Sequence, residues 1–154
     1  MKKVLLCAAI LGVAATYVQP AFADAEAAIT ARRAYYQVVK FNSGPLFGMA
    51  KGDVDYDAAK AQMYADNLKA LSSLNNGPMW IAGSDNEAMK GKTRALKAIW
   101  AEGSKIGDAA KAFNVAVDKL AADAGKGVDA LRPAVAALGA SCSGCHKAYR
   151  ASDF

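Results

Sequence analysis

Three residues near the end of the chain have the types and spacing to hold a prosthetic group. Cys142 and Cys145 are three positions apart, and His146, the one histidine of the sequence, follows directly. On a helix, residues three and four positions apart project to the same side. Two thiols placed in this way can form thioethers to the two vinyl groups of one porphyrin, and the imidazole can reach its iron. The Cys-x-x-Cys-His pattern therefore predicts one covalently attached haem c, with His146 as axial iron ligand.

Two other kinds of site also use paired cysteines. A thioredoxin-like dithiol lies near a βαβ unit, whereas the Ala- and Leu-rich run before Cys142 predicts a helix. A structural zinc site has four Cys or His ligands. The sequence offers three at the motif, and its remaining cysteine, Cys7, lies near the N-terminus. Haem attachment is therefore the favoured interpretation, and a dithiol or a metal site is the alternative.

The N-terminus has the pattern of an export signal. Two lysines and a short apolar run precede Ala21-Phe22-Ala23, which is an A-x-A cleavage pattern. The apolar run is too short to be a permanent membrane anchor. We expect a signal peptide over residues 1–23, cleaved after Ala23, followed by one domain over residues 24–154. The expected location is the periplasm, because c-type haem is attached on the far side of the bacterial inner membrane.

The charge pattern argues against a nucleic-acid partner. The chain has 19 Lys and Arg and 14 Asp and Glu, a formal net charge of +5. The lysines are scattered and alternate with acidic residues, whereas nucleic-acid binding needs a clustered basic face. A solvated helical surface is the better interpretation, with a mild preference for an acidic redox partner.

The periodicity of apolar residues predicts an all-α fold, an antiparallel four-helix bundle. The predicted helices span about 25–51, 57–74 and 96–124, and a fourth begins near Asp129 and carries the motif. A long loop over about 75–92 joins the second and third helices, and Gly44-Pro45 should kink or end the first. The apolar stripe of the last helix has steps of three and four and includes both thiols: Val135, Leu138, Cys142, Cys145 and Tyr149. This predicts a haem inside the bundle, against the last helix.

Several stretches in this order resemble the cytochrome c-prime family, which are periplasmic four-helix-bundle haem proteins with a C-terminal Cys-x-x-Cys-His. The resemblance covers about residues 31–150 and rests on Arg32-Arg33 with Tyr36, Met49 to Gly52, Tyr56 to Ala59, Thr93 to Ala95, Ile99-Trp100, Cys142 to His146 and Tyr149-Arg150. One departure is Leu96, where many members have Lys-Pro a residue later. This departure bears on the start of the third helix.

The resemblance implies an open iron site. Some close relatives place a methionine ligand four residues after the first-helix arginine, and Tyr36 holds that position here. The family then implies a five-coordinate, high-spin iron with His146 proximal and Tyr36 distal. Such an iron binds diatomic gases such as nitric oxide or carbon monoxide and can carry one electron. The alternative function is dedicated electron transfer without gas binding. No enzymatic activity is expected, because a peroxidase needs a distal base and the one histidine is committed to iron.

The family also implies roles for two arginines. Arg32 matches an arginine that pairs with a haem propionate, and its alternative role is an ordinary surface arginine. Arg150 could hydrogen-bond the ligand histidine or a gas on that face, or could serve only the helix dipole. Tyr36 is interpreted first as a steric gate, second as core packing and last as an iron ligand, with Tyr35 as the rival neighbour of the iron. Family members are commonly homodimers through their first two helices.

Overall fold

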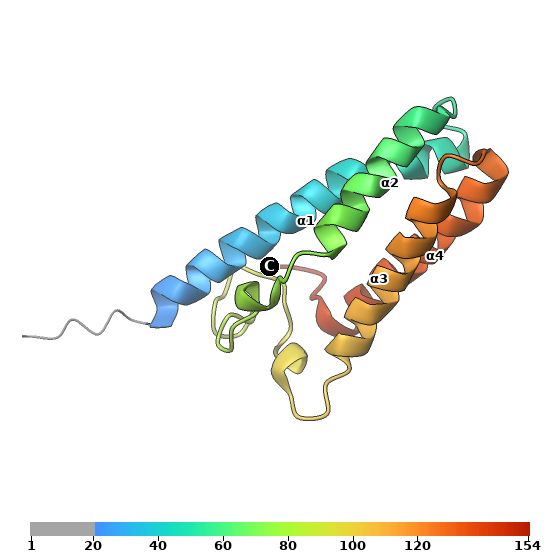
Figure 1. Cartoon of the computed structure of the whole chain (residues 1–154). Coiled ribbons are helices and arrows are strands. Elements are labelled where there is room, and N and C mark those ends of the chain that lie inside the picture. Colours follow the sequence, from blue (N-terminus) through green and yellow to red (C-terminus); the bar gives the residue numbers. More distant parts are fainter. Residues whose placement is uncertain (1–20) are drawn as a thin grey trace, which may run out of the picture.

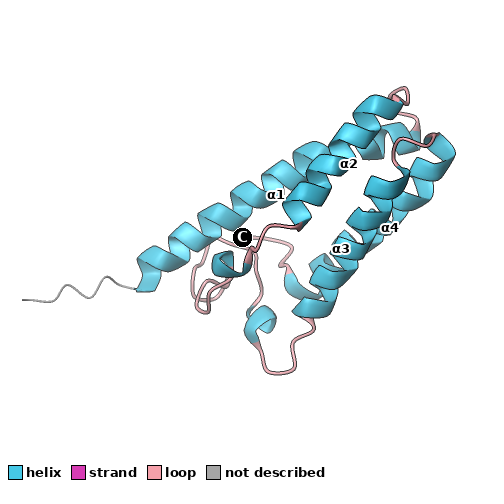
Figure 2. Cartoon of the chain, in the orientation of Figure 1, coloured by secondary structure: helices cyan, strands magenta, loops and turns pink. Residues whose placement is uncertain are grey.

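The computed structural model describes residues 21–154, which form a bundle of four α-helices without a β-strand in that range (Figures 1 and 2). The helices are α1 (Ala21–Lys51), α2 (Ala58–Ser72), α3 (Ile106–Asp123) and α4 (Val128–Tyr149). Residues 1–20, which hold most of the predicted signal peptide, lie outside the described residues. No described helix has the length and apolarity to span a membrane. The predicted all-α bundle is confirmed.

The helix α1 buries one continuous stripe of side chains. Its buried positions follow steps of three and four, as one face of a bundle helix requires, with Ile29 buried beside them: Ala25, Ala28, Arg32, Tyr35, Val39, Asn42, Leu46 and Met49. The helix does not end at Gly44-Pro45, so that expected alternative is wrong. Leu46 and Met49 beyond the proline are buried, and their burial fixes the last turn of α1 in the core.

The helix α2 begins where its sequence predicts. Asp57 is in an extended conformation, and its carboxylate accepts a hydrogen bond from the backbone N–H of Lys60 at 3.0 Å. This N-cap satisfies one of the backbone donors that a helix start leaves free. The tyrosine just before it, Tyr56, ties this corner to the α3–α4 turn. Its hydroxyl donates to the carbonyl of Ala124 at 2.8 Å and accepts from the N–H of Gly127 at 2.9 Å.

The predicted third helix over about 96–124 is wrong in its first part. Residues Lys97–Trp100 form a short 3-10 helix, η2, and α3 begins at Ile106. Between them Gly103 has a φ of 72°, a left-handed conformation that belongs to the turn before α3. The N–H of Leu96 bonds to the carbonyl of Tyr149, outside its own segment. The apolar spacing across 96–106 is therefore coincidental, because this segment packs against the end of α4.

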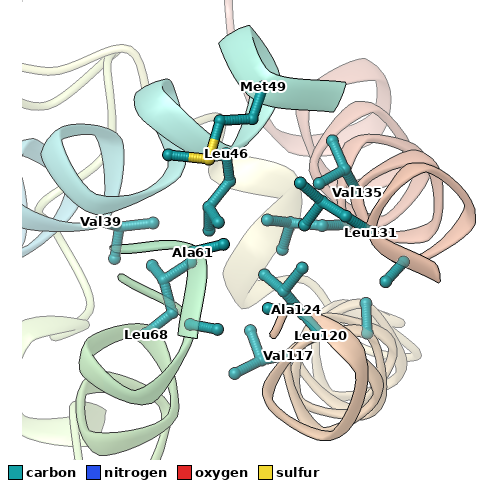
Figure 3. Close-up of a cluster of buried hydrophobic side chains, with 14 of the residues drawn as sticks. Val39, Leu46, Met49, Ala61, Leu68, Val117, Leu120, Ala124, Leu131 and Val135 are labelled. Atoms are coloured by element: carbon teal, nitrogen blue, oxygen red, sulfur yellow. The ribbon is translucent and has the colours of Figure 1, made fainter. Parts of the chain in front are cut away.

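The core of the bundle lies at the end where α1 finishes and α4 begins (Figure 3). Five leucines at this end have at most 1% of their surface exposed, and they come from all four helices: Leu46, Leu68, Leu120, Leu131 and Leu138. The turn between α3 and α4 closes this end, and a second 3-10 helix, η1 (Gly77–Met79), lies in the loop at the opposite end. That opposite end carries the cysteine motif.

Candidate haem site

The motif lies on the last two turns of α4, and its thiols face the bundle. Cys142 packs against the core cluster, and both Cys142 and Cys145 are half-buried and free of disulfide bonding. Burial raises the pKa of each thiol above its ordinary value. His146, four residues after Cys142, has a larger share of its surface exposed than either thiol. Both thiols are therefore protonated at neutral pH and lie on the inward stripe that the sequence predicts.

The stripe of apolar residues continues past the core, but the polypeptide buries it less. No residue from 139 to 149 of α4 is fully buried, and neither is any residue from 106 to 115 of α3. A groove of about 610 Å³ lies between these two segments. Most of its lining residues have small side chains, and Cys145 is the one thiol of the motif that reaches it. The lining residues are Lys105, Ala109, Ala112, Ala137, Ala140, Ser141, Gly144, Cys145, Ala148 and Tyr149.

The donor set and its surroundings fit a covalent haem. Both thiols lie on the inward stripe of α4, at the level where the side chains of α3 and α4 are only partly buried, and two thiols followed by an imidazole are the attachment and ligand groups of haem c. Among the described residues, no group of three or more His, Cys, Asp or Glu side chains converges as a metal cage would require. The zinc alternative is therefore not supported. The residues that would hold the haem are Cys142 and Cys145 through thioethers and His146 through its imidazole.

Two tyrosines of α1 lie on the side of the motif, and they differ in their surroundings. Tyr35 is 7% exposed, and its hydroxyl donates to the carbonyl of Leu71 at 3.2 Å, which places it in the core between α1 and α2. Tyr36 is 45% exposed, and Cys145 and Cys142 lie close enough to contribute to the raised pKa of its hydroxyl. The structure therefore brings Tyr36, rather than Tyr35, together with the motif.

The surroundings of Tyr36 strongly disfavour the ionised, phenolate form of its side chain. Burial of that end of the side chain, with smaller contributions from Cys145, Tyr35 and Cys142, raises the pKa of Tyr36 to about 12. Arg32 has the opposite effect on the pKa but is the weakest of the influences. At neutral pH the phenol is thus protonated, which agrees with ranking an iron-ligand role last.

Arg32 is a buried arginine, so its alternative role as a solvated surface residue is wrong. It is 3% exposed, and its two terminal nitrogens donate to loop groups of Met79, Ser84 and Thr93. Burial lowers its pKa, while the nearby Tyr36 and Asp85 raise it. Four hydrogen bonds use the four N–H groups of the terminal nitrogens, so among its donors the Nε–H is the one left to meet a carboxylate. The propionate contact stays a prediction.

Arg150 lies just after α4, next to a second arginine that the sequence does not single out. The backbone of Arg150 pairs with Ala95, and the N–H of Ala151 bonds to the carbonyl of Arg94 at 2.8 Å. Burial, followed by the charges of Arg150 and Arg94, lowers the pKa of His146. Both guanidinium groups therefore lie beside the predicted iron ligand. Arg94 belongs to one of the family-like stretches, Thr93 to Ala95, but no role at the site could be assigned to it from the sequence, because its place beside His146 depends on the path of the loop.

Known proteins share this sequence and this fold. The family model described as Cytochrome C' matches residues 27–150. A cytochrome c' from Cereibacter sphaeroides is 35% identical over 150 residues, covering 97% of this chain and 98% of that protein. The solved structure of a cytochrome c' from Rhodobacter sphaeroides has a TM-score of 0.80 and 35% identity, and covers 83% of this chain and 98% of that one.

Some similar structures were solved with gases bound. Two are variants of a cytochrome c' from Alcaligenes xylosoxidans, one with carbon monoxide (TM-score 0.70, 30% identity, 82% and 95% coverage) and one with nitric oxide (0.72, 28%, 84% and 97%). Another similar solved structure is that of a cytochrome c' described as having ligand-controlled dimer dissociation (TM-score 0.75, 27% identity, 83% and 97% coverage). From the family match, the sequence identity and the shared bundle, this chain belongs to the cytochrome c' family and has covalently bound haem c as its cofactor.

Proposed function

We propose that this protein is a periplasmic cytochrome whose five-coordinate, high-spin haem reversibly binds nitric oxide or carbon monoxide and can also carry one electron. The haem supplies the redox-active iron and its gas-binding position. Cys142 and Cys145 anchor it, and His146 is its one protein ligand. The observation that carries the proposal is the neutral phenol of Tyr36 beside the two cysteines, at the position where some relatives have a methionine ligand.

The other side chains near the site support this assignment. The sequence has no second histidine, so neither a bis-histidine iron nor a distal histidine base is available. The ring of Tyr36 supplies bulk without a strong ligand at neutral pH, because its pKa is about 12. Gas binding by relatives in solved structures is in keeping with such a site. We therefore favour binding and electron carriage over catalysis.

Absorption spectroscopy separates this proposal from the alternative of dedicated electron transfer. The purified ferrous protein should have a high-spin spectrum, and one equivalent of carbon monoxide should convert it to the spectrum of a six-coordinate complex. Nitric oxide should also bind. A low-spin ferrous spectrum that carbon monoxide leaves unchanged would sink the open-site proposal and favour the alternative.

We also infer that two copies of the chain pair through α1 and α2. A shallow groove of about 490 Å³ between these helices is lined mainly by apolar side chains, and several of them are exposed: Phe41 (72%), Leu74 (50%) and Val38 (46%). Apolar patches of this kind mark association sites. In sedimentation velocity experiments, Phe41→Glu should shift the protein towards monomer, whereas Val115→Glu on exposed α3 should not. Equal behaviour of the two variants would contradict this pairing.

The export signal remains part of the proposal. We expect cleavage after Ala23 and recovery of the haem-loaded protein from the periplasm. The intact mass of the secreted protein measures both points, because it gives the N-terminus and includes the covalent haem. An N-terminus other than Asp24 would correct the predicted cleavage site.

A further inference from the structure

Trp80, in the loop between α2 and α3, contacts Arg32 and Tyr36, two residues of the predicted gas site. The guanidinium carbon of Arg32 lies 4.9 Å from the centre of its ring. The ring of Tyr36 meets it at 6.3 Å and 74°, in an edge-to-face arrangement. The ring of Trp100 lies 6.3 Å from that of Trp80, and its indole N–H donates to the carbonyl of Trp80 at 3.1 Å. Trp80 is therefore held in place and touches the residue beside the cysteines.

The position of Trp80 is set by the loop around it, and Arg32 anchors that loop. One terminal nitrogen of Arg32 donates to the carbonyl of Met79 at 3.2 Å and to the hydroxyl of Ser84 at 2.7 Å. The other donates to the carbonyl of Ser84 and to the hydroxyl of Thr93 at 2.9 Å. Hydrogen bonds from a charged group are stronger than neutral ones. A single buried side chain of α1 thus fixes both ends of the segment that carries Trp80.

The ring of Tyr36, in contrast, is positioned by aromatic contacts. It lies against Tyr35 at 5.1 Å and 83° and against Trp80. Within residues 21–154, no hydrogen bond from the Tyr36 hydroxyl to another side chain or to the backbone adds to these contacts. Tyr35 is itself immobilised in the core by burial and by its bond to Leu71. The loop side of the Tyr36 ring therefore depends on Trp80.

We propose that Trp80 is a positioning residue that holds the Tyr36 ring in place and thereby limits how fast a diatomic gas reaches the iron. This inference rests on the proposed function, in which Tyr36 is the distal neighbour of the iron. An edge-to-face aromatic pair favours its geometry by a factor of roughly 2 to 12. Removing the ring of Trp80 should increase the population of displaced Tyr36 by that factor, and with it the rate of gas entry.

The rate of carbon monoxide association to the ferrous protein tests this inference through a double-mutant cycle. Trp80→Leu should raise the rate roughly 2- to 12-fold. Tyr36→Ala should raise it further, and Trp80→Leu should have no additional effect in the Tyr36→Ala background. A general change in the haem environment would instead increase the rate by the same factor in both backgrounds, and that outcome overturns the inference.

Hydrogen exchange supplies a readout that does not involve the gas. Because Arg32 anchors the loop through hydrogen bonds to Met79, Ser84 and Thr93, none of which uses the Trp80 ring, Trp80→Leu should leave most of the protection of residues 75–96 in place. Arg32→Gln should reduce that protection, whereas Arg33→Gln, its neighbour on α1, should have a smaller effect, since Arg33 donates one hydrogen bond to the loop, to the carbonyl of Lys92. Equal loss in the two arginine variants would overturn the assigned anchor.

The result also separates this inference from the proposed function. A wild-type protein that binds no carbon monoxide contradicts the proposed function itself. A wild-type protein that binds it, with an unchanged rate in Trp80→Leu, overturns the role of Trp80 alone. If Trp80→Leu does not load haem, Trp80→Met keeps a long apolar side chain without a ring and has the same expected and contradicting results.

Discussion

The two ends of this bundle carry the same pattern of apolar residues but are filled differently. At the end with the α3–α4 turn, Leu120 and Leu131 are fully buried by other side chains of the chain. At the other end, Ile106, Phe113 and Cys142 continue the same stripes but are only half-buried. Periodicity therefore identifies which helix faces point inward, but not what covers those faces. At the motif end, the two thiols indicate that a haem covers the inward helix faces.

The difference also separates two kinds of stabilisation. The packed end is stabilised by the burial of apolar side chains, which contributes about 25 cal/mol per Å² of apolar surface. The motif end is held by a few polar anchors, such as Arg32 on the loop and the pairing of residues 95 and 150. Substitutions at the first end should therefore change stability, and those at the second should change haem attachment and gas access.

The largest expected effect is the loss of covalent haem at the motif end. In the double variant Cys142→Ala with Cys145→Ala, no thiol of the motif remains to form a thioether, so covalent haem should be lost completely. Haem absorbance that stays with the polypeptide under denaturing conditions measures this. The matched control is Ser143→Ala, between the two thiols, which should keep full haem attachment, and covalent haem in the double variant would contradict the assigned site.

A substitution in the packed end should act on stability. Leu120 is fully buried, so Leu120→Ala leaves a cavity and should reduce the free energy of unfolding by about 2 to 5 kcal/mol. Val115 on the same helix is 60% exposed, and Val115→Ala should change it by less than about 0.5 kcal/mol. Denaturant unfolding of the haem-loaded protein measures both values. Similar losses in the two variants would mean that the packed end is not where the stability lies.

A smaller effect is expected where the packed end is closed. Tyr56→Phe removes a donor to the carbonyl of Ala124 and an acceptor for the N–H of Gly127, which should cost about 1 to 2 kcal/mol of stability. The position of the haem bands should not change, because Tyr56 lies at the packed end. Unfolding curves and absorption spectra of the same samples measure both points, and a spectral shift without a loss of stability would argue against the separation of the two ends.

Helix content and haem attachment were predictable from the sequence, because each depends on local spacing. The stripe of α4 and the N-cap of Asp57 are examples. The start of α3 was not predictable, because the backbone of Leu96 bonds to Tyr149, a partner distant in sequence. The surroundings of Arg32 were also missed. Its partners come from an irregular loop, where Ser84 and Thr93 have no periodicity to identify them.

The choice between Tyr35 and Tyr36 shows the same limit. Both tyrosines fit an inward stripe of α1 at the level of spacing, and the family resemblance favoured Tyr36. Tyr35 is buried among α1 and α2, while Tyr36 meets Trp80 and the motif. One residue of difference rotates a side chain by about 100° around a helix with 3.6 residues per turn. Three-dimensional contacts were needed to distinguish them.

The most direct test of the account is the ferrous absorption spectrum of Tyr36→Met beside that of Tyr35→Met and the wild type. A thioether that replaces the ring next to an open iron can ligate it. We expect a high-spin, carbon monoxide-reactive wild type, a low-spin spectrum for Tyr36→Met and a wild-type spectrum for Tyr35→Met. A wild type that is already low-spin, or a low-spin spectrum in Tyr35→Met alone, would contradict an open iron site with Tyr36 beside it.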